Sequence, residues 1–112
     1  MQYLLLIYEP EQRFASGGYP AAELAEYRAM GKEYEKTIVS GKALQPTSTA
    51  TTVRVREGKR LTTDGPFAET KEQLGGFYMI EARDLDEALG MAAKIPAARY
   101  GSIEVRPILK FD

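Results

Sequence analysis

Nonpolar residues follow one another almost without interruption in two segments, residues 3–8 and residues 75–80. The first segment stops at Glu9-Pro10, and the second ends before Arg83-Asp84. Short nonpolar runs bounded by polar or turn residues are typical of β-strands that are covered on both faces. We therefore predict two central strands at these positions.

The segment that begins at Ala21 has the spacing of an amphipathic helix. Its nonpolar or small positions recur every three or four residues, at Leu24, Tyr27, Gly31, Tyr34 and Ile38. Pro20 suits the first helical turn, and glycine commonly ends a helix. The pattern therefore predicts a helix from Ala21 that ends at Gly41.

A second helix is predicted after the second nonpolar segment. Asp84 is expected to cap its first turn, and Glu87 stands three residues later, as a capping box requires. Pro96 is expected to end this helix. The residues that follow lead to a last predicted strand with the sequence IEVRPIL.

Between the first helix and the second central strand, the sequence TTVRVREGKRLTT alternates polar and nonpolar residues around Glu57-Gly58-Lys59. This alternation predicts a β-hairpin. The predicted order is strand, helix, hairpin, strand, helix, strand. Right-handed crossovers then place both helices on the same face of one antiparallel sheet. We expect a single α+β domain, residues 1–112, with the ferredoxin-like βαββαβ arrangement.

Both faces of the predicted central strands are nonpolar. In the first strand, one set of side chains is Tyr3, Leu5 and Ile7, and the opposite set is Leu4, Leu6 and Tyr8. Two helices cover only one face, and monomeric proteins seldom expose a nonpolar patch larger than a few hundred square ångströms. We therefore expect a homodimer in which a second copy covers the other face and encloses a cavity between two sheets.

The charge balance argues against two classes of partner. Lysine and arginine together number 15 and aspartate and glutamate 16, so the formal net charge is −1. A nearly neutral chain without basic runs is not expected to bind nucleic acid or an anionic membrane surface. No nonpolar run approaches the roughly 18 residues of a transmembrane helix.

The chain contains no cysteine and no histidine. The first absence excludes disulfides and thiolate nucleophiles and fits a cytoplasmic location. The second removes the commonest general base and the commonest metal ligand. Glycine-rich nucleotide-binding motifs are also absent, so we expect no cofactor and no metal. A cation held by scattered carboxylates is left open.

The sequence LTTDGPFAETKEQLGGFY, residues 61–78, concentrates turn residues and charges. Its structural interpretation is local. Gly65 permits a positive φ, Asp64 can cap the free amides after Pro66, Phe67 is expected to pack inward, and residues 69–73 are expected to form a helical turn.

A functional interpretation of the same segment is equally open. An aspartate held at the mouth of a cavity can act as an acid or base, and Asp64 is the first candidate. Arg54, Tyr8 and Tyr78 are candidates to position a ligand, although buried tyrosines also simply complete cores. For Tyr27, at helical spacing, a core position is expected.

Two arginines lie in loops rich in glycine or alanine, Arg13 and Arg99. Each can clamp a carboxylate through two hydrogen bonds or remain solvated. The sequence does not decide between these alternatives.

The segment TDGPFAETKEQLGGFYMIEARDLDEALGMAAKIPAARYGSIEVRPI, together with MQYLLLIYEP, is similar to the DGPF branch of the YCII-related family. The similarity covers nearly the whole chain and implies a fold of the dimeric α+β barrel superfamily. The residues that match the signature and its charged continuation are Asp64, Gly65, Pro66, Phe67, Glu69, Lys71 and Glu72. The resemblance adds Gly65, Pro66, Phe67 and Glu69 to the candidate ligand-binding residues.

The resemblance implies less about chemistry. YCII-type relatives are proposed to carry a histidine and aspartate pair in a cleft, and a mechanism that needs the imidazole is not transferable to a chain without histidine. Branch members are described as companions of extracytoplasmic-function sigma factors, which implies a possible protein partner of that kind.

Two functions follow from the sequence. The first is a dimeric ligand-binding or regulatory protein whose ligand is a small carboxylate or carbonyl compound. The alternative is a small-molecule enzyme that performs proton transfer or elimination, with Asp64 as acid or base in the cavity between the sheets. Without histidine, the first function is favoured.

Overall fold

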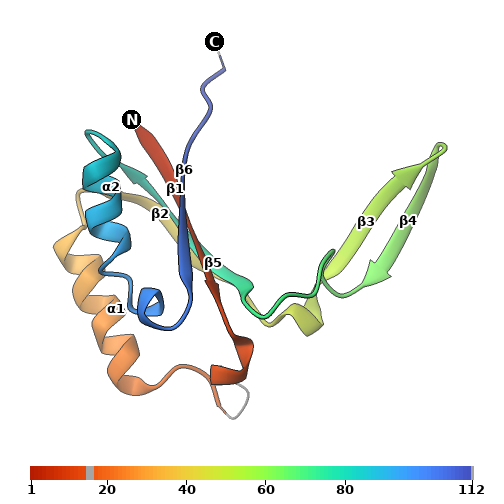
Figure 1. The fold of residues 1–112 in the computed structure, drawn as a ribbon, viewed down its shortest axis with the longest axis horizontal. Helices are drawn as coiled ribbons and strands as arrows, with labels where there is room; N and C mark the ends of the chain where they lie inside the picture. The colour runs from red at the N-terminus through yellow and green to blue at the C-terminus, as the bar shows by residue number, and fades with distance from the viewer. Residues whose placement is uncertain (15–16, 112) are drawn as a thin grey trace.

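In the described residues, 1–14 and 17–111 of this computed structural model, four strands form one antiparallel sheet in the order β2-β5-β1-β6. The strands are β1 (Gln2–Glu9), β2 (Ile38–Ala43), β5 (Gln73–Glu81) and β6 (Ser102–Pro107). The helices α1 (Ala21–Glu33) and α2 (Leu85–Ala92) lie on one side of this sheet (Figure 1). Single 3-10 turns are η1 (Glu11–Phe14), η2 (Thr47–Thr49) and η3 (Pro96–Arg99). The predicted ferredoxin-like α+β arrangement is confirmed.

Strand β1 lies in the centre of the sheet, between β5 and β6. Its side chains alternate between buried and half-buried positions along the whole strand. The buried set, Tyr3, Leu5 and Ile7, faces the helices and forms the core with residues such as Ile80 and Met91. The opposite set faces away from the helices. The predicted division of β1 into two nonpolar faces is therefore confirmed.

The second helix begins as the sequence predicts. The Asp84 side chain accepts a hydrogen bond from the Glu87 backbone N–H at 2.9 Å. The Glu87 side chain accepts one from the Arg83 backbone N–H at 3.1 Å. These bonds satisfy amide groups that a helix start leaves without intrahelical partners.

The predicted end of the first helix is wrong. Helix α1 ends at Glu33, and the residues that were expected to continue it to Gly41 form the edge strand β2 instead. β-Branched residues have low helix propensity, and Thr37, Ile38 and Val39 stand in succession here. Pairing with β5 then supplies the backbone hydrogen bonds that a continued helix would have made.

The hairpin forms as predicted but does not belong to the main sheet. β3 (Thr51–Arg56) pairs only with β4 (Lys59–Asp64), in a separate two-stranded sheet. It extends away from the body of the molecule, as the pale green strands on the right of Figure 1 show. Because β2 occupies the position beside β5, the hairpin does not pair with β5.

We predict opposite effects for two glycine-to-alanine substitutions. A Cβ atom at Gly101 would overlap the Tyr8 carbonyl oxygen and lie 2.8 Å from the Glu9 Cα atom, both in the central strand. Gly101→Ala should therefore destabilise the protein by about 3 kcal/mol or more. Gly90 lies exposed in α2 with nothing within 4 Å, so Gly90→Ala should stabilise it by about 0.5–1 kcal/mol. Urea unfolding measures both; equal effects would contradict the described backbone contact.

Candidate functional site

Two carboxylates are buried in the described part of the chain, Glu9 with 2% and Glu23 with 4% of its surface exposed. Arg13 lies between them. Its Nη1 is 2.5 Å from Glu9 Oε1, and its Nη2 is 2.6 Å from Glu23 Oε1. Buried charges are costly unless they are paired and hydrogen-bonded. In this Glu9-Arg13-Glu23 set, called here the carboxylate cluster, Arg13 therefore pairs with both buried carboxylates of the described structure.

Local structure explains how these residues meet. Glu9 ends β1 in the buried phase of the strand, after Tyr3, Leu5 and Ile7. Arg13 follows four residues later in the turn η1. Glu23 belongs to the first turn of α1, where the helix dipole favours a negative charge.

The cluster holds one positive group for two carboxyl groups. Glu23 Oε2 is buried without a hydrogen-bond partner among the described residues. Burial raises the pKa of Glu9, an effect that the neighbouring Glu23 increases and Arg13 opposes. The Glu9 carboxyl group therefore takes up a proton more readily than an exposed glutamate does.

Aromatic rings surround the cluster. The Arg13 guanidinium lies 3.7 Å from the centroid of the Tyr100 ring and 5.0 Å from that of Phe14. These are cation-π distances. On the other side, the Tyr19 hydroxyl donates a hydrogen bond to Glu9 Oε2 at 3.5 Å. Tyr19 thereby connects the cluster to the neighbouring pocket.

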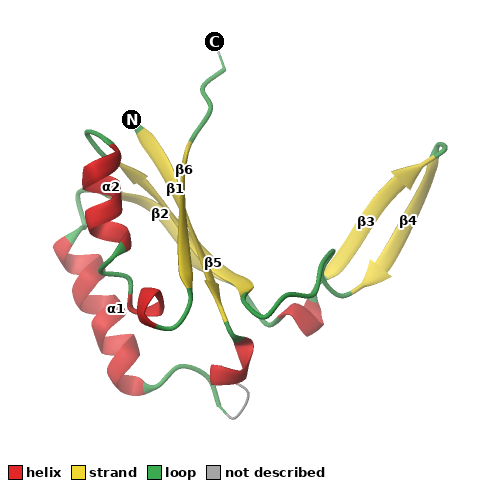
Figure 2. Ribbon diagram, in the orientation of Figure 1, coloured by secondary structure: helices red, strands yellow, loops and turns green. Residues whose placement is uncertain are grey.

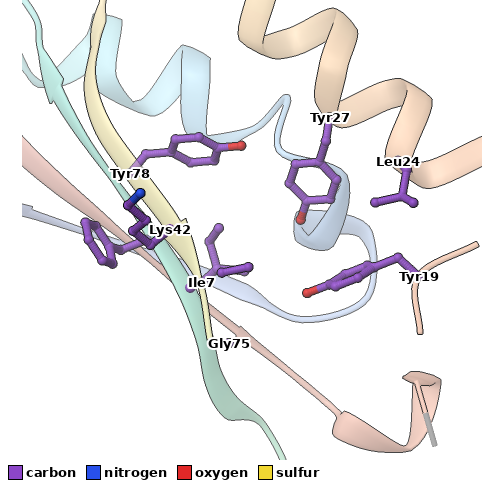
Figure 3. Close-up of a pocket in the computed structure, with 11 residues that line it drawn as sticks. Ile7, Tyr19, Leu24, Tyr27, Lys42, Gly75 and Tyr78 are labelled. Carbon is purple, nitrogen blue, oxygen red and sulfur yellow. The ribbon is translucent and has the colours of Figure 1, made fainter. Parts of the chain in front are cut away.

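That pocket lies between α1 and the β2-β5 edge of the sheet and has a volume of about 260 Å³. Its lining includes Ile7, Tyr19, Leu24, Tyr27, Phe77 and Tyr78. Figure 3 shows the hydroxyl groups of Tyr19, Tyr27 and Tyr78 directed into the same space. We call it the tyrosine pocket.

The three hydroxyl groups are hydrogen-bond donors at neutral pH. Burial raises the pKa of Tyr19 to about 12, and the negative charge of Glu9 adds to the effect. Burial also raises the pKa of Tyr27 and of Tyr78. Among the described residues, neither the Tyr27 nor the Tyr78 hydroxyl meets a hydrogen-bond partner. Both are therefore available to a molecule in the pocket.

Glycine shapes the sheet side of the pocket. A Cβ atom at Gly41 would lie 2.7 Å from Cδ1 of the Tyr78 ring, and one at Gly76 would lie 2.8 Å from the Lys42 carbonyl oxygen. The absent side chains let the Tyr78 ring lie flat on β2 and let the two strands approach. Both glycines line the pocket.

The structure separates the site residues that the sequence predicts. Tyr78 lines the tyrosine pocket on the helix side of the sheet. Tyr8, Pro66 and Phe67 line a second hollow, of about 640 Å³, beside the base of the hairpin. Arg54 lies on the hairpin, opposite Leu61. The sheet thus stands between Tyr78 and Tyr8.

The local structure around the DGPF motif differs from its prediction. Gly65 has the expected positive φ of 97°, and Asp64 is exposed at the end of β4. Phe67 is 81% exposed, so its predicted inward packing is wrong. Residues 69–72 contain no helical turn, Gln73 already belongs to β5, and Glu69 is exposed. Pairing of Gln73 with Glu9 draws this segment into the sheet before a turn of helix can form.

Both loop arginines bind carboxylates of the chain itself. Arg99 forms two hydrogen bonds to Glu26, at 2.7 and 2.8 Å, and both side chains are exposed. Arg13 lies within the carboxylate cluster. The two-bond clamp on one carboxylate is therefore present at Arg99, whereas Arg13 binds two different carboxylates through one nitrogen each.

Sequence reasoning missed Glu9, Glu23 and Tyr19. A usable signal was present for Glu9, because it continues the every-second-residue series of Tyr3, Leu5 and Ile7. A strand places such a residue on the same face as its core side chains. Glu23 and Tyr19 carry no comparable signal, since their burial depends on contacts with β1. Tyr27, which was expected in the core, packs against the core and also lines the pocket.

Neither an acidic metal-binding group nor a membrane-spanning helix is found in the described residues. The described residues hold no group of three acidic side chains that could bind a metal ion. Nor does any helix in residues 1–14 and 17–111 have the length and hydropathy to cross a membrane.

Comparison with known proteins defines the class. The YCII-related domain profile matches residues 1–112, and the chain belongs to the YCII-related family. A relative in this family is the uncharacterized protein R00369 of Rhizobium meliloti (strain 1021). The two are 39% identical over 115 residues, which cover 96% of this chain and 92% of the relative.

A solved structure shares the fold. It is the 5-chloro-2-hydroxyhydroquinone dehydrochlorinase (TftG) from Burkholderia phenoliruptrix AC1100 in complex with 2,5-dihydroxybenzoquinone. The TM-score is 0.60 and the sequence identity 14%, with 97% of this chain and 94% of the other covered. At this identity the similarity establishes the α+β fold.

The carboxylate cluster predicts a specific pH dependence. A carboxyl group whose pKa is higher in the folded state stabilises the fold fully below its ordinary value of 4.5 and loses that contribution as the pH rises through the raised pKa. Glu9→Gln removes this titration. Between about pH 4 and pH 7, the melting temperature of the wild type should therefore fall relative to that of Glu9→Gln.

Thermal melts over this pH range measure the difference. Glu35→Gln, a substitution of an exposed glutamate in the segment after α1, controls for the change of net charge. If the Glu9→Gln and Glu35→Gln proteins follow the same pH profile, Glu9 does not carry the raised pKa.

Proposed function

We propose that the protein is a homodimeric binding protein for a small, uncharged carbonyl compound with a single ring, which occupies the tyrosine pocket. The observation that carries this proposal is the convergence of three tyrosine hydroxyl groups in one largely nonpolar pocket. Tyr19 already donates to Glu9, and the Tyr27 and Tyr78 hydroxyl groups meet no partner among the described residues, so these two donors suit a ligand that presents oxygen acceptors.

The volume of the pocket limits the size of the ligand. At about 260 Å³ it is slightly smaller than the roughly 300–1,000 Å³ that is usual for drug-sized molecules. Ile7 and Leu24 supply nonpolar contacts to the body of the ligand. A compound with one ring and few substituents fits these limits.

Electrostatics favours a carbonyl over a carboxylate ligand. Two buried carboxyl groups share one guanidinium beside Tyr19, so the Tyr19 end of the pocket is negative unless one of them is protonated, whereas Lys42 lines the pocket on β2. A second anion close by would be repelled across a medium of low dielectric constant. An uncharged carbonyl oxygen accepts the same hydrogen bonds without this repulsion.

A second candidate function is catalysis of proton transfer, and the hydrogen bond between Tyr19 and Glu9 favours it. Tyr19 lines the pocket, and Glu9 has a raised pKa, so a protonatable carboxyl group stands one hydroxyl group away from a bound carbonyl. In this version Glu9 replaces Asp64 as acid or base. The structural neighbour is itself an enzyme whose structure holds a one-ring carbonyl compound, 2,5-dihydroxybenzoquinone.

The dimer is supported by the face of the sheet that lies away from the helices. Its side chains Leu4, Leu6, Tyr8, Leu74, Phe77 and Met79 are all half-buried within the single chain. We call this the open face. Burial of nonpolar surface is worth about 25 cal/mol per square ångström, so covering the open face with the same face of a second copy stabilises both.

We expect acetophenone, an uncharged one-ring ketone, to bind in the tyrosine pocket and benzoate, its anionic counterpart, to bind far more weakly. Titration of ¹⁵N-labelled protein should shift the amide signals of Gly41 and Gly76 with acetophenone. Tyr27→Phe and Tyr78→Phe should each weaken binding about fivefold, the equivalent of one hydrogen bond of about 1 kcal/mol.

Tyr34→Phe is the matched control, because Tyr34 also packs from the α1 side against the core and is not part of the pocket lining. It should bind acetophenone like the wild type. Equal binding of benzoate would contradict the electrostatic argument. Acetophenone shifts confined to other parts of the chain would contradict the assignment of the pocket.

A further inference from the structure

The β3-β4 hairpin has no packing partner in the described chain. Its strands pair with each other, and no other strand or helix packs extensively against them. Figure 2 shows both strands standing clear of the helices and the main sheet. An isolated two-stranded hairpin is at best marginally stable in water. The hairpin, called the arm below, therefore needs a surface to lie on.

The two faces of the arm differ. Residues that pair across the two strands share a face, so Val53 and Val55 lie together with Thr62 and Arg60. We call this the valine face. Val53 is 59% and Val55 63% exposed. On the opposite face Arg54 stands across from Leu61. The valine face thus presents the larger β-branched, nonpolar surface to solvent.

The position of the arm indicates what lies beside it. In Figure 1, α1 and α2 lie on one side of the main sheet and the arm extends on the other. The second side is that of the open face. Whatever covers the open face therefore lies next to the arm.

Charge indicates which molecule the arm fits. Residues 51–64 contain four basic and two acidic side chains, whereas the remainder of the chain contains eleven basic and fourteen acidic ones. The arm is therefore basic and the body acidic. A second copy of this chain offers both an acidic body and a second open face. In a two-fold symmetric pair, each arm reaches the other body and the contact closes on itself.

We infer that the arm clasps the body of a second copy, with its valine face against the partner. This inference rests on the proposed dimer and adds the element that holds it. The open faces supply the central contact, and the two arms enclose it from opposite ends. The arm sequence then gains the tertiary packing that it lacks in the single chain.

Paired substitutions on the two faces of the arm test the inference. Val53→Asp places a charge on the valine face, and Thr63→Asp places the same charge on the opposite face of the same arm. Both positions are exposed in the single chain, so neither substitution removes a buried contact within the monomer. In sedimentation equilibrium, Val53→Asp should weaken dimerisation at least tenfold and Thr63→Asp should leave it nearly unchanged.

Cross-linking provides an independent measurement, because the chain has no cysteine and one introduced thiol is unique. Val55→Cys is labelled with a benzophenone maleimide, and equal amounts of ¹⁴N and ¹⁵N protein are mixed, equilibrated and irradiated. We expect cross-linked peptide pairs of mixed isotope composition, which form only between two chains. Their body-derived peptide locates the surface on which the arm lies.

The outcomes separate the two proposals. A wild-type protein that sediments as a monomer overturns both the dimer and the clasp. A wild-type dimer that Val53→Asp leaves intact, or whose cross-links all lie within one chain, overturns the clasp alone. Acetophenone binding is independent of either result, since the tyrosine pocket lies on the helix side of a single chain.

Discussion

The ion pairs between Glu9, Arg13 and Glu23 connect the end of the central strand to the start of the first helix. They are buried, so each carboxylate depends on the guanidinium for its stability in a medium of low dielectric constant. The same contacts hold α1 beside β1 at this end of the molecule and leave the tyrosine pocket between α1 and the sheet edge. The same ion pairs therefore determine where the tyrosine pocket lies and which charged groups stand beside it. Removing the arginine would leave two buried charges uncompensated.

The excess of one carboxyl group in this cluster links stability to ligand preference. A fully paired cluster would be electrically neutral and indifferent to the charge of a nearby molecule. With one guanidinium for two carboxyl groups, the site is either negative or protonated. The first state disfavours anions, and the second provides a proton close to Tyr19. The two proposed functions, binding and proton transfer, thus depend on the same arrangement of side chains and differ only in whether the ligand reacts.

The open face and the arm show that the single chain leaves nonpolar surface in two places. The helices cover one face of the sheet, and the arm stands on the opposite side. Neither surface is covered by the described chain, and they lie next to each other. In the proposed two-fold pair, one symmetry operation would bury both nonpolar surfaces, and the opposite charges of arm and body would favour its orientation.

The sequence by itself determined the features that depend on short-range geometry. Residues 3–8 form a strand whose successive side chains point to opposite sides, and this defined the two faces of β1. The Glu57-Gly58-Lys59 turn defined the hairpin. Asp84 with Glu87 defined the start of α2. Only the tertiary structure decided which strand lies beside β5. The edge accepts one neighbour, and β2 takes it, which ends α1 early and leaves the hairpin outside. The site was decided in the same way: Glu9 and Tyr78 come from paired strands and Glu23 and Tyr27 from a helix packed on them. Local patterns do not report which distant segments will meet, since that outcome depends on competition for the same buried surface.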